Sequence, residues 1–166
     1  MEIRPETNAD RAAVAIVHRL AFGRSEEAEL VAAVRGLAAP EISLVALREG
    51  AIVGHILFTP VTIGEPPAPV AAVGLGPLAV LPRLQRSGIG SELVRQGLDA
   101  VRRRAQEVVV VLGHPGFYPR FGFEPVARHG LRYLQPVPEE AFMVLEIVPG
   151  RLRGLSGAIR YLSPFG

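Results

Sequence analysis

The 166-residue sequence contains no cysteine, no lysine and no tryptophan. The absence of cysteine excludes a disulfide framework, a thiolate metal site and a cysteine nucleophile. The four histidines show no HxH or HExxH spacing, so we expect no metal cofactor. Residues 69–82, the most apolar stretch, are interrupted by glycine and proline and are too short to span a membrane. The first eight residues are polar and lack a signal-peptide core, which favours a cytoplasmic protein with no membrane partner.

A strong excess of one charge is also missing. All 18 basic residues are arginine, and 16 acidic residues oppose them, which leaves a formal net charge of +2. Arg102–Arg104 form the only basic cluster, and they fall where a helix is expected to end, a position where arginine complements the helix dipole. Because nucleic-acid binding needs a strongly basic face, we do not expect a nucleic-acid partner.

What the chain does contain is typical of one globular domain. Hydrophobic residues make up 49% and charged residues 20% of the sequence, enough apolar surface to offset the entropy of ordering. A length near 150 residues favours a single core, so we expect one domain over residues 1–166.

Hydrophobic spacing predicts strands and helices in a mixed order. Strand patterns and helical patterns alternate, and a β-branched run at 108–112 is typical of a central strand buried on both faces. The expected strands cover residues 2–4, 42–49, 51–58, 70–80, 108–112 and 142–148, and the expected helices cover 7–22, 25–36 and 89–101, with a short aromatic segment at 115–123. This order predicts an α/β (α+β mixed) fold with one mixed, largely antiparallel sheet and helices on both faces.

The most informative stretch lies between residues 80 and 91, where a strand ends, a glycine-containing loop follows and an amphipathic helix begins at once. The first N–H groups of a helix have no partners within it, and the helix dipole favours an anion there. Gly88 and Gly90 lack a Cβ, so a phosphate could approach the backbone closely. The loop is not a Walker loop, because the chain has no lysine, and it lacks the third glycine of a dinucleotide fingerprint. A plain tight turn remains the alternative at this stage.

The preceding strand strengthens the ligand interpretation. Gly76-Pro77 interrupts an otherwise strand-like run, and proline cannot donate to a sheet ladder. In a central strand this predicts a bulge or a splayed pair of strands, with free backbone groups inside the sheet. An extended ligand with amide groups could dock there like an added strand, with its phosphates at the adjacent helix start. Coenzyme A, with its pantetheine arm and pyrophosphate, has this chemistry.

Two motifs at this separation resemble those of a known family. Leu78-Ala-Val-Leu-Pro followed by Gln85-Arg-Ser-Gly-Ile-Gly is similar to motif A of the GNAT superfamily of N-acetyltransferases, with its Q/R-x-x-G-x-G/A signature. Phe117-Tyr-Pro-Arg-Phe-Gly-Phe-Glu resembles motif B, and the order of elements matches over nearly the whole chain. Val53-Gly-His and Leu112-Gly-His-Pro resemble the YhbS-like group within that superfamily.

The resemblance implies a GNAT fold and an enzyme that uses acetyl-CoA as its cosubstrate. It implies that Tyr118 protonates the leaving thiolate, whereas His114 stands where many members carry asparagine. The residues expected to bind the cofactor are those of motif A, namely Leu78, Ala79, Val80, Gln85, Arg86, Ser87, Gly88, Ile89, Gly90 and Ser91. Direct transfer in a ternary complex fits the absence of a cysteine nucleophile.

The general base and the acceptor-binding residues have no motif as specific as the one for the cofactor. His114 follows the central strand close to the splayed strands, and imidazole is a suitable proton acceptor, although a lone histidine is more often structural. Phe22 and Arg24 in one turn and Glu139 before the last strand are the expected acceptor-binding residues, and a water could replace a side-chain base. His18 and His55 fall within regular patterns and are expected to be structural.

Two broader alternatives concern function and assembly. A non-catalytic acyl-CoA-binding sensor would keep the fold without the chemistry. The acceptor is expected to be a small amine or the amine of a peptide or protein, and the residues do not rank these. The apolar segment Leu155–Phe165 could pack on a partner, such as a second copy, or close over the site.

Overall fold

The structure, a computed structural model, describes residues 1–166 and contains three α-helices and nine strands. The helices are α1 (Arg11–Phe22), α2 (Glu26–Val34) and α3 (Ile89–Arg103). The strands are β1 (Glu2–Pro5), β2 (Ile42–Arg48), β3 (Ala51–Ile63), β4 (Ala72–Val80), β5 (Val108–Leu112), β6 (Glu124–Pro125), β7 (Leu131–Tyr133), β8 (Phe142–Glu146) and β9 (Gly157–Arg160).

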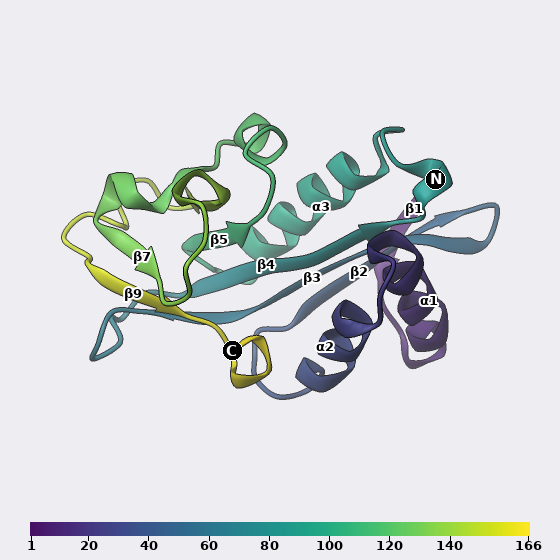
Figure 1. Ribbon diagram of the computed structural model, residues 1–166, viewed down its shortest axis with the longest axis horizontal. Helices are drawn as coiled ribbons and strands as arrows, with labels where there is room; N and C mark the ends of the chain where they lie inside the picture. Colours follow the sequence, from purple (N-terminus) through teal and green to yellow (C-terminus); the bar gives the residue numbers. More distant parts are fainter.

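The sheet is mixed and largely antiparallel, as expected. Its order is β1-β2-β3-β4-β5-β8-β6, and only the central pair β4–β5 is parallel in this path. Strand β9 pairs with the end of β3 and, in parallel, with β7. Figure 1 shows α3 on one face of the long central strands and α1 and α2 on the other, which confirms helices on both faces.

The two faces of the sheet carry separate cores because successive side chains of a strand point to opposite faces. On the α3 face, Val73, Leu75, Val109 and Val111 join the buried cluster that α3 covers. On the other face, Ala72, Val108 and Val110 belong to a second cluster packed with β7, β8 and β9. The run Val108–Val111 is buried on both faces, as its β-branched sequence predicts.

The expected opening between the two central strands is present. The last pair between β4 and β5 joins Leu75 to Val111, and β4 then continues to Val80 paired only with β3. Opposite Gly76-Pro77, β3 offers one residue where β4 has two, which is a β-bulge. Residues 78–80 therefore have no strand partner on the side away from β3, beyond the end of β5.

The structure decides three local features that the sequence pattern left open. The aromatic segment after β5 forms only a 3₁₀ turn, Tyr118–Phe121, because its prolines and glycines stop a longer helix. Ser25 stands at the N-cap of α2, but its hydroxyl donates to Glu29 (2.8 Å) and does not cap the helix. The apolar tail packs on its own chain: β9 joins the sheet, and Leu162 and Phe165 lie against the cluster under α1 and α2.

Candidate active site

The loop between β4 and α3 has the backbone conformation that its sequence predicts. Gly88 is the N-cap of α3 and adopts φ +93°, in the left-handed region where glycine is favoured. The side chain of Gln85 turns back and donates to the carbonyl of Val80 (3.0 Å), which ties the loop to the end of the strand. The loop is therefore held in place from both of its ends.

The backbone N–H groups of Arg86 through Ser91 donate to no group of the protein. The first intrahelical bond at this end is donated by Glu92 to Gly88 (3.0 Å). Six consecutive free donors at the positive end of a 15-residue helix form a ready site for an anion. The glycines leave space there, because a Cβ on Gly88 would meet no atom within 4 Å.

A groove of 580 Å³ runs from this helix start along the free edge of β4. It brings together seven of the ten residues expected to bind the cofactor, which are Leu78, Val80, Gln85, Arg86, Gly88, Gly90 and Ser91. Ala79 and Ile89 are buried and face away from the groove, and Ser87 is exposed outside its lining. For Ala79 and Ile89, only backbone groups could serve a ligand.

The groove also has residues that the sequence did not single out as binding residues. Gly116, Phe117 and Arg120 complete its lining on the side opposite to α3. The Arg120 guanidinium lies over the Phe117 ring, 4.8 Å from its centroid, so a cation borders the groove. The sequence contains 17 other arginines, and no local pattern marks Arg120 among them as a binding residue.

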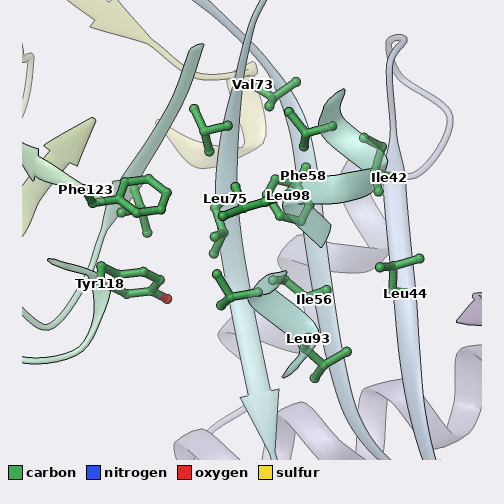
Figure 2. Packing of buried hydrophobic residues seen from close by; sticks show 14 of the residues in the cluster. Ile42, Leu44, Ile56, Phe58, Val73, Leu75, Leu93, Leu98, Tyr118 and Phe123 are labelled. Atoms are coloured by element: carbon green, nitrogen blue, oxygen red, sulfur yellow. The ribbon is translucent and has the colours of Figure 1, made fainter. Parts of the chain in front are cut away.

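Tyr118 is buried next to Phe117, in the core cluster that α3 covers, and does not itself line the groove. Its ring is 7% exposed and packs edge-on against Phe117 and Phe123 at centroid distances of 4.9 and 5.7 Å. Figure 2 shows its hydroxyl directed toward the strand that carries Leu75. Burial raises the pKa of Tyr118, so the phenol keeps its proton at neutral pH.

His114 lies at the boundary of two cavities. Its exposed side chain lines the groove and also a neighbouring cavity of 360 Å³, whose lining includes Glu140. No protein group hydrogen-bonds to its imidazole. Glu139, the neighbour of Glu140, is exposed and lines neither cavity.

Comparisons with known proteins agree with this geometry. The family description "Acetyltransferase (GNAT) domain" matches residues 2–126. The chain is 41% identical over 162 residues to the uncharacterized N-acetyltransferase YjhQ of Escherichia coli strain K12, covering 94% of this chain and 89% of that protein. This chain belongs to the GNAT acetyltransferase family. The uncharacterized N-acetyltransferase YhbS of the same strain is 36% identical over 167 residues, with 99% and 98% of the two chains covered.

Two solved structures resemble this GNAT enzyme over 99% of its length. A crystal structure of YhbS from Escherichia coli in complex with CoA has a TM-score of 0.92 at 34% identity and is covered to 91%. A GNAT acetyltransferase from Brucella melitensis in complex with acetyl-CoA has a TM-score of 0.82 at 34% identity and is covered to 97%. The expectations of a GNAT fold and of an N-acetyltransferase are therefore confirmed.

The residues expected to bind the acceptor, Phe22, Arg24 and Glu139, do not line the groove of this GNAT enzyme. Phe22 and Arg24 flank Gly23 at the end of α1, and neither lines the groove. The Arg24 guanidinium is paired with Glu27, its Nε lying 3.0 and 3.1 Å from the two carboxylate oxygens. Phe22 is 41% exposed and stacks on His18.

His18 and His55 are fully buried and form a hydrogen-bonded row that sequence reasoning did not reveal. His18 Nε2 lies 2.8 Å from His55 Nδ1, and His55 Nε2 lies 2.8 Å from the hydroxyl of Ser43. The same hydroxyl contacts Glu6, which is also paired with Arg35. Hydrogen bonds from its partners hold the pKa of Glu6 at about 2, despite burial, so it is a carboxylate.

The charge of Glu6 determines where the protons of this row lie. A carboxylate can only accept, so Ser43 donates to Glu6, and His55 Nε2 must then donate to Ser43. His55 Nδ1 is left as an acceptor for the Nε2–H of His18. The Nδ1 atom of His18 is therefore unprotonated, and it is buried with no partner. Burial lowers the pKa of His18 to about 3, so both rings are neutral at neutral pH.

Two further observations concern metals and membranes. No group of three or more His, Asp or Glu side chains comes together in a way that could hold a metal ion. No helix is long and apolar enough to cross a membrane.

Proposed function

We propose that this GNAT enzyme, acting as one domain over residues 1–166, transfers the acetyl group of acetyl-CoA to a primary amine within a ternary complex. The observation that carries this proposal is the row of six free backbone N–H groups at the start of α3, beside the open edge of β4. Phosphates are the ligands that such a helix start favours. The CoA and acetyl-CoA present in the two similar solved structures support the same ligand.

The free edge of residues 78–80 suits the pantetheine arm. These residues pair with β3 on one side only, so their N–H and C=O groups on the side away from β3 can bond the amides of an extended ligand. This arrangement would direct the thioester into the opening between β4 and β5. The pyrophosphate would then lie against the N–H groups of Arg86–Ser91, with Arg120 across the groove.

The reaction forms a C–N bond and breaks the C–S bond of the thioester. The amine nitrogen attacks the carbonyl carbon, and the sulfur leaves as a thiolate that needs a proton. We assign that proton to Tyr118, whose hydroxyl remains protonated at neutral pH. Burial raises the pKa of Tyr118 and makes it a weaker acid, so transfer requires a thiolate whose pKa is raised by the same loss of water.

The amine also loses a proton, and His114 is the proposed acceptor of it. Its imidazole lies free at the mouth of the groove and is the side chain best suited to accept protons near neutral pH. Phe22, Arg24 and Glu139 stay proposed acceptor-binding residues. Arg24 would have to leave Glu27 to bind an acidic group of the acceptor.

Calorimetric titration with acetyl-CoA tests the proposal. We expect micromolar binding by the unmodified enzyme and a loss of about tenfold or more in Gly88→Trp, because the indole would occupy the phosphate position. Gly50→Trp is the matched control: Gly50 also has a positive φ and open space around it, but it lies in the β2–β3 turn away from the groove. Absence of binding by the unmodified enzyme, or equal losses in both variants, would refute the proposal.

A further inference from the structure

Tyr161 in the C-terminal tail lies directly on the central strand of the sheet. A Cβ on Gly74 would fall 2.3 Å from Cε1 and 2.9 Å from Cζ of Tyr161, so the ring occupies the space that a side chain at residue 74 would need. Val73 and Leu75 point into the cluster beneath α3, so Gly74 faces the opposite side of the sheet. Tyr161 therefore covers β4 on the face away from α3.

Tyr118 has the corresponding position on the other face. Its Cε2 would lie 2.3 Å from a Cβ on Gly113, just after β5, and it belongs to the cluster that α3 covers. Gly74 is paired with Val110, one pair before β4 and β5 separate. Two tyrosines thus flank the opening between these strands, one from each face.

The face that Tyr161 covers is rich in aromatic rings and has unpaired hydroxyl groups. Tyr133 lies edge-on to Tyr161 at 5.8 Å, and Phe142 lies beneath at 6.5 Å. The Tyr161 hydroxyl bonds to no protein group, and Thr59, directly opposite Gly74 on β3, has a buried hydroxyl without a partner. Burial and the neighbouring phenols of Tyr133 and Tyr118 raise the pKa of Tyr161, so it remains a neutral phenol.

We propose that the Tyr161 hydroxyl binds the nitrogen of the acceptor amine, and that the rings of Tyr133 and Tyr161 form the site of its alkyl chain. This inference rests on the proposed function, because a cofactor bound in the groove at the start of α3 would leave the opposite face of the sheet for the second substrate. A primary amine has two N–H groups and one lone pair. It can donate one N–H to the phenol oxygen while the lone pair points at the thioester carbon. Aromatic faces also attract an ammonium group as it arrives.

The proposal gives the C-terminal tail a part in substrate binding. The tail is held by β9 on one side and by Leu162 and Phe165, which pack against the cluster under α1 and α2, on the other. Tyr161 stands between these two anchors, which fixes its ring over Gly74. Tyr161 is a binding and positioning residue, because a phenol that keeps its own proton at neutral pH cannot take one from an amine.

Tyr161→Phe tests the proposal with n-butylamine as the probe. The variant loses one oxygen that has no protein partner, so it is expected to fold normally. We expect KM for n-butylamine to rise about fivefold to twentyfold, in line with the loss of one hydrogen bond, with the Kd for acetyl-CoA unchanged. Ser163→Ala removes an exposed hydroxyl from the same tail and is expected to leave both constants unchanged.

A second readout does not depend on turnover. Calorimetric titration of n-butylamine into the enzyme saturated with CoA is expected to show weaker binding to Tyr161→Phe by a similar factor. Equal KM and equal binding in the two proteins would overturn the proposal, as would an enzyme that binds acetyl-CoA but neither binds nor acetylates n-butylamine. Failure to bind acetyl-CoA would instead refute the proposed function, so the two failures are distinguishable.

Discussion

The ring of Tyr118 fills the place of a side chain at Gly113: a Cβ there would lie 2.3 Å from Cε2 of the tyrosine. Gly113 does not have a positive φ, so alanine causes no backbone strain at this position. Gly113→Ala therefore forces the Tyr118 ring to move. The pair therefore offers a way to displace the proposed acid without altering its chemistry.

We predict that Gly113→Ala lowers kcat by about tenfold to a hundredfold, because a displaced general acid loses most of its contribution. Overpacking should also cost about 1–3 kcal/mol of stability. Gly97→Ala is the control, since a Cβ there would lie 2.5 Å from Phe58 in the core under α3, away from the groove. Steady-state kinetics and thermal unfolding of both variants check this. Equal loss of kcat in the two variants would show that Tyr118 placement is not the cause.

The buried histidine row predicts a single tautomer for His18. Glu6 can only accept, so Ser43 donates to Glu6, His55 donates to Ser43, and His18 donates to His55. His18 is therefore protonated on Nε2 and unprotonated on Nδ1. Long-range ¹H–¹⁵N correlation spectra of the labelled protein measure this directly. We expect one unprotonated ¹⁵N resonance for Nδ1 of His18 at neutral pH. A protonated Nδ1 would contradict this order of donors.

The same row predicts a loss of stability in acid. The pKa of Glu6 is lowered from 4.5 to about 2, and that of His18 from 6.5 to about 3, so both groups bind protons more readily in the unfolded chain. Their contribution to the free energy of unfolding is fully present above the pKa values of the unfolded chain. It is lost as pH falls, through the range 6.5 to 3 for His18 and the range 4.5 to 2 for Glu6. Each unit of difference corresponds to about 1.4 kcal/mol, as an upper limit.

Urea unfolding between pH 7 and pH 3.5 measures this decline. In His18→Gln the amide can still donate to His55, but the group that titrates is gone. The variant should therefore lose less stability than the unmodified protein between pH 6.5 and pH 4.5, whatever its stability at pH 7. Parallel curves for the two proteins over that interval would show that His18 does not contribute.

Local sequence was sufficient for the start of α3, the positions of most strands and the groove, whereas α1 begins at Arg11 instead of residue 7 and β3 continues to Ile63 past its expected end at residue 58. The glycines at residues 88 and 90, the amphipathic spacing of α3 and the Gly76-Pro77 interruption act over a few residues, and each led to the observed conformation. Seven of the expected cofactor-binding residues meet in one groove because they lie on a single strand–loop–helix unit. Short strands such as β7 and β9 escaped prediction, because three or four residues are too few for a periodic pattern.

The sequence by itself therefore determined the family, the glycine turn before α3 and the opening in the sheet. Only the tertiary structure decided which distant side chains meet. His18 and His55 are 37 residues apart and share a hydrogen bond, and Tyr161 reaches Gly74 from the far end of the chain. Such contacts depend on how α1 and the tail pack across the sheet. That packing is set by the summed burial of many apolar side chains, and no local pattern records which polar atoms it will bring together.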